Sequence, residues 1–199
     1  MKTEMKPIRE TIQLEEARQL IADACKPIDR TERVRLLDAN GRVAASDVLS
    51  TRDVPPFARA GMDGFAVRAE DTFGASRYES KPLRVIDKIY TGQVPTRPVE
   101  AGTAIEIATG APMPLGADAV VMVEESEKAG EAVRIFTPVY PRQHVGRRAA
   151  DIAAGQPVLA AGDFLNASRV GAIAAIGAFE VEVFARPTVA ILSTGNSSM

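Results

Sequence analysis

The chain has 199 residues, 46% of them hydrophobic, and its 24 Lys and Arg residues against 26 Asp and Glu residues give a net charge of −2. This is enough apolar material for at least one core, while the balanced charge offers no basic field for nucleic acid or an anionic membrane. The single cysteine, Cys25, and the single histidine, His144, exclude an internal disulfide, a cysteine-based zinc site and a histidine-rich metal site.

Targeting signals are not found in the sequence. No run approaches the roughly 18 apolar residues of a membrane span, and residues 1–7 carry charges without the apolar stretch of a signal peptide. We therefore expect a cytoplasmic protein with no membrane partner and no nucleic-acid partner.

The N-terminal segment predicts one helix followed by short extended pieces. Residues 12–28 place apolar side chains at helical spacing, which predicts an amphipathic helix that ends before Pro27. The runs 34–37 and 42–48 are expected to be extended on either side of a turn at Asn40-Gly41.

The segment from about 55 to 140 is rich in Gly and Pro and predicts a small, mostly β module. Its short β-like runs are 65–67, 83–89, 103–107, 119–123 and 132–136. After Pro141 the sequence predicts a helix that is capped by Asn166 and stops at Gly177. A half-buried strand should follow over 179–184, where apolar and acidic side chains alternate.

The last predicted element is a strand over 188–192, a continuous apolar run typical of a strand buried in a parallel sheet. Such a strand needs neighbours and a crossover helix, for which the remaining residues are too few. The pattern therefore predicts a chain that stops inside a domain; the alternative is that this run pairs with the preceding module.

The first motif, over 55–67, contains Asp63-Gly64 between a Pro-Pro pair and a new strand. The Asp-Gly pair predicts a tight turn in which the glycine has a positive φ. One interpretation is that Asp63 only hydrogen-bonds the turn backbone. The other is that its carboxylate faces a cleft and orients a metal ion or a water.

Three further motifs offer groups for an anionic ligand. Thr109-Gly110 opens a stiff Pro-x-Pro loop with a hydroxyl and backbone N–H groups, although any rigid surface loop looks similar. Arg147-Arg148 could pair with phosphate or could form a solvated turn. Ser193-Thr194-Gly195 follows the predicted 188–192 strand at its carboxyl end, where α/β folds place ligands.

Taken in order, these four motifs resemble the molybdopterin molybdenumtransferase family (MoeA and the gephyrin E domain), of which this chain is similar to the N-terminal half. The resemblance runs from about residue 12 to 195. It implies an α+β, mostly β fold in which a discontinuous elongated domain carries an inserted β-rich domain. The implied boundaries are 1–54 and 141–187 for the elongated domain, 55–140 for the inserted domain, and 188–199 for the first strand of a truncated molybdopterin-binding α/β domain.

The resemblance also implies a function in molybdenum cofactor biosynthesis. Family members insert molybdate into adenylylated molybdopterin with release of AMP, use a divalent cation such as Mg²⁺, and work as homodimers. On matching positions the catalytic residues are Asp63, Thr109 and Asp151, with Asp63 and Asp151 as metal ligands. The substrate-binding residues are Arg147, Arg148, Ser193, Thr194 and Gly195.

The chain departs from the family pattern in three places. Asn196-Ser197 stands where Asp-Glu is usual, Ala149-Ala150 where Gly-Glu is usual, and Ala60-Gly61 where Ser-Ala is common. The family's cleft also includes a domain that this chain lacks, so the isolated chain is expected to have little or no turnover. The alternatives are a non-catalytic dimerisation or scaffold module and a simple anion-binding module.

Overall fold

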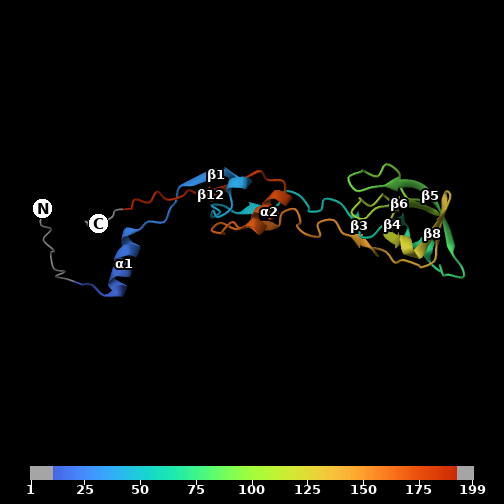
Figure 1. Cartoon of the computed structure of the whole chain (residues 1–199), viewed down its shortest axis with the longest axis horizontal. Helices are drawn as coiled ribbons and strands as arrows, with labels where there is room; N and C mark the ends of the chain where they lie inside the picture. Colours follow the sequence, from blue (N-terminus) through green and yellow to red (C-terminus); the bar gives the residue numbers. More distant parts are fainter. Residues whose placement is uncertain (1–10, 192–199) are drawn as a thin grey trace, which may run out of the picture.

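The structure is a computed structural model that describes residues 11–191, and Figure 1 shows it as an elongated molecule. A helix lies towards one end, a small body follows it, and a second body built on a six-stranded sheet lies at the other end (Figure 1). The described residues are mostly β with two α-helices, as the sequence predicts. None of those helices is long and apolar enough to cross a membrane.

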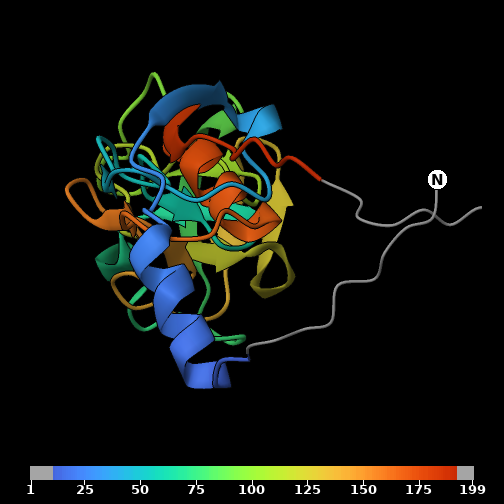
Figure 2. The same ribbon diagram turned by 90° about the vertical axis from the view of Figure 1, so that its left-hand side faces the viewer.

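The first helix, α1 (Leu14–Ala24), confirms the predicted amphipathic helix and ends before Pro27. It buries none of its residues, and its large apolar side chains, among them Leu20 and Ile21, are exposed. Figure 1 shows α1 standing apart from the first body, and Figure 2, which looks along the molecule, shows it projecting to one side. Within the described residues, the apolar face of α1 has no partner.

The first body joins the two ends of the described chain. Strand β1 (Thr31–Arg35) pairs antiparallel with β12 (Glu180–Phe184), and β2 (Val48–Leu49) pairs with β11 (Pro157–Leu159). Helix α2 (Ala167–Ala175) packs beside them over a core that includes Leu165, Ile173, Val181 and Val183. Segments more than 100 residues apart in the sequence therefore share one core, as expected for a discontinuous domain.

Two predicted elements of this body are confirmed in detail. The Asn166 side chain accepts a hydrogen bond from the backbone N–H of Arg169 (2.9 Å) and caps α2, and Gly177 ends that helix with φ +80°. Along β12, Val181 and Val183 are buried while Glu180 is exposed, as the alternating pattern predicts.

The prediction for residues 34–48 is correct for its turn and only in part for its extended segments, since Val34 and Arg35 lie in β1 and Val48 begins β2. Gly41 has φ +78°, but 42–48 forms only the isolated bridges Val43↔Phe164 and Ala44↔Val183 before β2. The chain is extended earlier than expected, in β1, and Leu36–Asp38 is a short 3₁₀ helix. The reason is that the partner of β1 is the distant β12, and their pairing ends at Arg35↔Glu180.

The second body is a sheet in the order β7-β4-β6-β5-β9-β8, in which every pair is antiparallel except β5 with β6. All five predicted β-like runs form strands of this sheet. The strands are β4 (Gly64–Val67), β5 (Lys81–Ile89), β6 (Thr103–Ile107), β7 (Ala119–Met122), β8 (Ser126–Ala129) and β9 (Ala132–Ile135). Strand β8 was not predicted, because its sequence Ser-Glu-Lys-Ala lacks apolar alternation.

The two edge strands of this sheet are neighbours in the sequence, so the sheet curls. Strands β7 and β8 are joined only by the 3₁₀ turn Val123–Glu125, which spans on the order of 14 Å at most even when extended. Curling buries both faces: Phe65, Val121 and Ile135 lie in one apolar cluster, Ile105 and Val120 in another.

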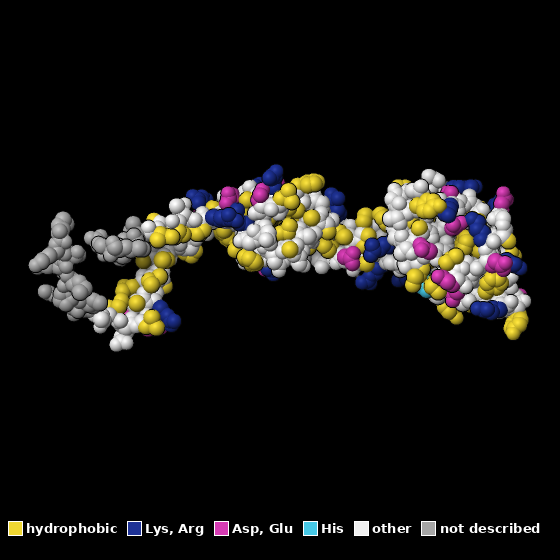
Figure 3. All heavy atoms as spheres, viewed as in Figure 1, with side chains coloured by type: hydrophobic (Ala, Val, Ile, Leu, Met, Phe, Trp, Pro, Cys, Tyr) yellow, Lys and Arg dark blue, Asp and Glu magenta, His cyan; other side chains and the backbone are white. Residues whose placement is uncertain are grey.

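Two antiparallel segments connect the bodies. Val54 exchanges backbone hydrogen bonds with Ile152 (2.7 and 3.1 Å), and the N–H of Ala149 donates to the carbonyl of Pro55 (3.0 Å). Further along, β3 (Arg59–Ala60) pairs with β10 (Val145–Gly146). In the space-filling view the connection is narrower than either body and carries Lys and Arg side chains (Figure 3).

The predicted strand over 188–192 is wrong for its described residues. Residues 188–191 form no strand, and Val189 and Ile191 are exposed. A buried strand needs a neighbour for its backbone N–H and C=O groups, and no segment within 11–191 pairs with this run. Ser193, Thr194 and Gly195, together with Asn196 and Ser197, lie outside the described residues.

Candidate functional site

The pairing of β4 with β6 brings Asp63 and Thr109 together. Gly64, at the start of β4, lies opposite Ile107, at the end of β6, so the residue before one strand neighbours the loop after the other. Asp63 Oδ1 accepts the backbone N–H of Thr109 at 2.6 Å and its hydroxyl at 2.9 Å. Two of the residues predicted to be catalytic therefore form one hydrogen-bonded unit.

Gly64 holds this unit in place, though not by the predicted positive φ. It is a strand residue with ordinary backbone, and a Cβ at this position would lie 1.9 Å from the carbonyl oxygen of Val121. The glycine is needed because β7 passes too close to β4 for any side chain. The Asp-Gly pattern thus indicated a special glycine correctly but for the wrong reason.

The hydrogen bonds keep Asp63 ionised. The backbone N–H of Thr109, and then its hydroxyl, lower the pKa of the Asp63 carboxyl. Both donors of Thr109 thus stabilise the Asp63 carboxylate. The anionic group that Thr109 binds in this structure is therefore Asp63 itself. Within residues 11–191, Asp63 Oδ2 accepts no hydrogen bond and can serve a cation or an external donor.

Asp63 lines a surface pocket of about 400 Å³. The pocket has apolar walls and carries three charged side chains that no sequence motif indicated. Its lining residues are Asp63, Gly64, Phe65, Lys88, Tyr90, Glu106, Ile107, Ala108, Val123, Ser126 and Lys128.

A compact ion triad of Lys88, Glu106 and Lys128 also lines the pocket. Lys88 Nζ lies 2.7 Å from Glu106 Oε1, and Lys128 Nζ lies 2.5 Å from Glu106 Oε2. The hydrogen bonds from Lys128 and Lys88 lower the pKa of Glu106, and the bond to Glu106 raises the pKa of Lys88. Lys88 Nζ also lies 4.9 Å from the centre of the Tyr90 ring. Two cations and one anion give this region a net positive charge.

The third predicted catalytic residue, Asp151, lies elsewhere. It is exposed in the connection between the bodies, where its backbone N–H donates to the carbonyl of Val54 (2.9 Å). No hydrogen bond among the described residues joins it to Asp63 or Thr109. Over residues 11–191, no group of three or more His, Cys, Asp or Glu side chains is arranged to hold a metal ion.

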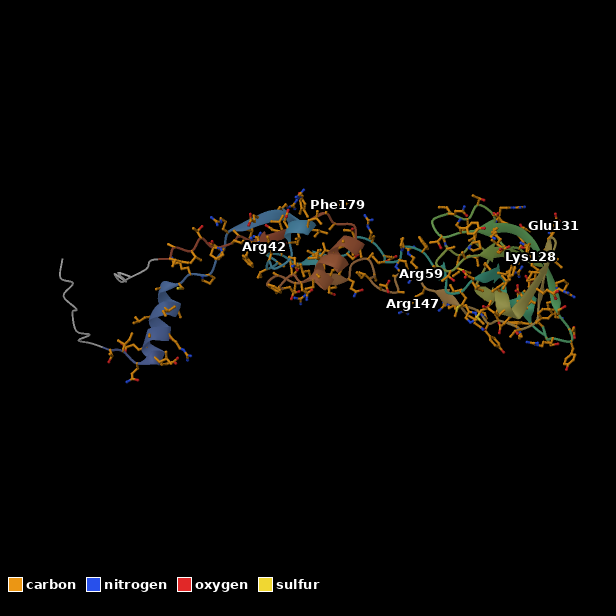
Figure 4. The ribbon with its side chains drawn as sticks, viewed as in Figure 1. Arg42, Arg59, Lys128, Glu131, Arg147 and Phe179 are labelled. Atoms are coloured by element: carbon orange, nitrogen blue, oxygen red, sulfur yellow. The ribbon has the colours of Figure 1, made fainter. Side chains whose placement is uncertain are left out.

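The two predicted phosphate-binding arginines differ in their surroundings. Arg148 pairs with Asp53, which also accepts the backbone N–H of Ala154 at 2.8 Å. The Ala154 N–H, and then Arg148, lower the pKa of the Asp53 carboxyl. Arg147 is exposed and forms no ion pair with the described residues. Figure 4 shows Arg147 and Arg59 at the connection, away from Lys128 on the second body.

Gly61, one of the departures from the family pattern, also has a structural reason. Its N–H donates to the carbonyl of His144 at 2.7 Å, and a Cβ at Gly61 would lie 3.1 Å from that oxygen. His144 itself has φ +56°, and its Nδ1 lies 3.0 Å from the Val120 carbonyl. Gly61 is therefore fitted to a close backbone contact beside the site.

Fold and site together define a class of protein. The chain is elongated and mostly β, and its curled-sheet body carries a pocket lined by a carboxylate, Asp63, and by the paired lysines Lys88 and Lys128. Residues 12–177 match the MoeA N-terminal region (domain I and II), and the chain belongs to that family.

Named relatives agree with this assignment. The chain is 37% identical to molybdopterin molybdenumtransferase 2 of Mycobacterium tuberculosis over 92% of its length and 45% of that protein. It is 40% identical to the molybdopterin molybdenumtransferase of Nostoc sp. over 83% of its length and 38% of that protein. The crystal structure of the molybdopterin biosynthesis MoeA protein from Pyrococcus horikoshii OT3 superposes with a TM-score of 0.81 at 38% identity, covering 89% of this chain and 47% of that one. The chain thus spans less than half the length of these relatives.

Proposed function

We propose that this chain contributes to the insertion of molybdate into adenylylated molybdopterin, with release of AMP, as part of molybdenum cofactor biosynthesis. The observation that carries this proposal is the Asp63–Thr109 unit at the edge of the pocket. The names of the relatives support the reaction, and the ionised carboxylate fits it, since both substrates are polyanions that need a cation or ordered donors.

The residues present fit a divalent cation in part. Asp63 offers one carboxylate oxygen that accepts no hydrogen bond from the described residues, and Mg²⁺ is commonly held by one or two carboxylates together with substrate phosphates and water. Asp151, the other proposed metal ligand, lies in the connection and not beside Asp63, so within residues 11–191 the fit rests on Asp63. When bound, Mg²⁺ would neutralise charge on the phosphates. The role of Thr109 is to keep Asp63 ionised and in one orientation.

Arg147 is the proposed contact to the anionic substrate from the connecting segment, because it is exposed and not engaged in an ion pair with the described residues. Arg148 would give up or share its contact with Asp53 to join it. Ser193, Thr194 and Gly195 remain proposed substrate ligands.

The test of this function is an Asp63→Asn variant, with Lys81→Met as a control on the same body. Each is placed in a protein that contains the rest of a relative's length, and AMP release from adenylylated molybdopterin is measured with molybdate and Mg²⁺. Loss of turnover in an Asp63→Asn protein that still folds, as judged by its melting curve, supports a working carboxylate. Full turnover would leave the alternative of a non-catalytic dimerisation or scaffold module.

We also propose that the protein is a cytoplasmic homodimer that associates through its first body and α1. Leu37 (87% exposed) and Phe179 (85% exposed) project from the first body beside a surface hollow, and the apolar face of α1 is uncovered (Figure 4 labels Phe179). Light scattering at several concentrations tests this. We expect a mass of about twice 21.2 kDa for the wild type and a lower mass for the double variant Leu37→Ser/Phe179→Ser. A wild-type chain that is monomeric at every concentration contradicts the proposal.

A further inference from the structure

The lysine pair that lines the pocket has no role in the function proposed above. We propose that Lys88, Lys128 and Tyr90 bind a phosphate ester carried on a planar, amino-bearing heterocycle. This deepens the proposed function, on which it rests for the choice of heterocycle: in adenylylated molybdopterin such a group is either the adenylyl part or the pterin part.

The lysine pair carries charge and donors that the protein does not use up. Glu106 binds one ammonium with each of its oxygens, so it holds Lys88 and Lys128 next to each other. Each ammonium has three N–H donors and uses one on Glu106, and the two side chains are 46% and 45% exposed. The triad therefore keeps a net charge of about +1 and unused donors at the pocket. A phosphate monoester, with a charge near −2, matches both.

An apolar wall lies next to this charge. Tyr90 and Val123 are each about half exposed and line the same pocket, and Phe65 and Ile107 complete its apolar surface. The Lys88 ammonium lies over the Tyr90 ring, 4.9 Å from its centre, so a ligand bound by Lys88 brings its flat ring to the exposed part of Tyr90. Inorganic phosphate would leave this wall uncovered.

The pocket that holds the lysine pair is also lined by the ionised Asp63, whose Oδ2 accepts nothing from the described residues. A second anionic group would be repelled there, whereas an exocyclic amino group can donate to that oxygen. The pocket thus favours a ligand that carries both a phosphate and an N–H donor.

The experiment titrates the chain, by calorimetry, with four probes: AMP, neopterin monophosphate, adenosine and inorganic phosphate. At least one of the two esters is expected to bind about tenfold more tightly than adenosine and inorganic phosphate. The tighter ester identifies which part of the substrate the pocket receives. Equal binding of all four probes, or no measurable binding of either ester, overturns the proposal.

Variants test the named residues. Lys128→Met leaves Glu106 paired with Lys88 and should weaken ester binding about tenfold, because one charged donor is lost. Tyr90→Leu keeps apolar volume but removes the ring and should cost about fivefold. Lys81→Met is the matched control: Lys81 lies on the same strand as Lys88, pairs with Glu79, and does not line the pocket. Unchanged binding in Lys128→Met, with folding confirmed by circular dichroism, contradicts the proposal.

The two proposals can fail separately. Ester binding that depends on Lys128, with AMP release that does not depend on Asp63, would retain the pocket and reject the proposed role of Asp63 in the reaction. AMP release that depends on Asp63, with no ester binding by the chain, would support the role of Asp63 and reject the ester-binding pocket.

Discussion

A single oxygen of Asp63 accepts both the backbone N–H and the hydroxyl of Thr109, two residues 46 positions apart in the sequence. The contact follows from the antiparallel register of β4 and β6, which places the start of one strand at the end of the other. Asp63 Oδ1 is thereby fixed in position, and Oδ2 accepts no hydrogen bond from the described residues.

Replacing Thr109 by Val removes the hydroxyl donor and leaves the backbone donor in place. We expect the pKa of Asp63 to rise towards the ordinary aspartate value of about 3.9, because the ionised form loses one of its two hydrogen bonds. Carboxyl carbon chemical shifts followed over pH measure this directly. Thr109→Ser should keep the low pKa, and an unshifted pKa in Thr109→Val would contradict the role given to the hydroxyl.

The same pKa predicts how stability depends on pH. Since the folded-state pKa of Asp63 lies below the unfolded value, its ionised form stabilises the fold above about pH 4, and this contribution is lost as the pH falls through the folded-state pKa. Any stability advantage of the wild type over Asp63→Asn should be constant from about pH 7 to 5 and shrink below about pH 4. Urea unfolding at several pH values tests this. An advantage that grows on acidification would show the sign to be wrong.

Replacing Gly64 tests the close packing of β4 against β7. In Gly64→Ala the new methyl would lie 1.9 Å from the Val121 carbonyl oxygen, so β7 has to move. We expect the free energy of unfolding to fall by about 3 kcal/mol. Gly171 is the control, because it lies inside α2 and a Cβ added there would meet no atom within 4 Å.

Gly171→Ala should raise the free energy of unfolding by roughly 0.5–1 kcal/mol, through helix propensity alone. Urea denaturation of both variants gives the comparison. If Gly64→Ala were no less stable than the wild type, the close approach of β4 and β7 would be refuted.

Local patterns in the sequence were enough to predict much of the fold. Asn166 and Gly177 bound α2 as expected, because capping chemistry depends on neighbouring residues. Strand β8 was missed since its polar residues are held at a sheet edge only by β9. The strand expected over 188–192 was wrong for residues 188–191, the part that the structure describes, because an apolar run becomes a strand only where another strand receives its hydrogen bonds.

In the candidate site, too, local motifs predicted single residues but not the contacts between them. Motifs were enough to indicate Asp63 and Thr109 individually, whereas their contact depends on the register of β4 and β6. Lys88 and Glu106 are direct partners in the parallel β5–β6 register, and Lys128 reaches them from the sheet edge only because the sheet curls. Such a triad depends on pairing between strands, which no local pattern in the sequence specifies.

The most direct test of the account is AMP release by this chain joined to the part of the Mycobacterium tuberculosis relative that follows the matched region. The wild-type fusion and Lys81→Met are expected to release AMP from adenylylated molybdopterin in the presence of molybdate. Asp63→Asn is expected to fold with a melting temperature at pH 7 within a few degrees of the wild type and to show background turnover. Full turnover in a folded Asp63→Asn fusion would contradict the central claim that this carboxylate takes part in the reaction.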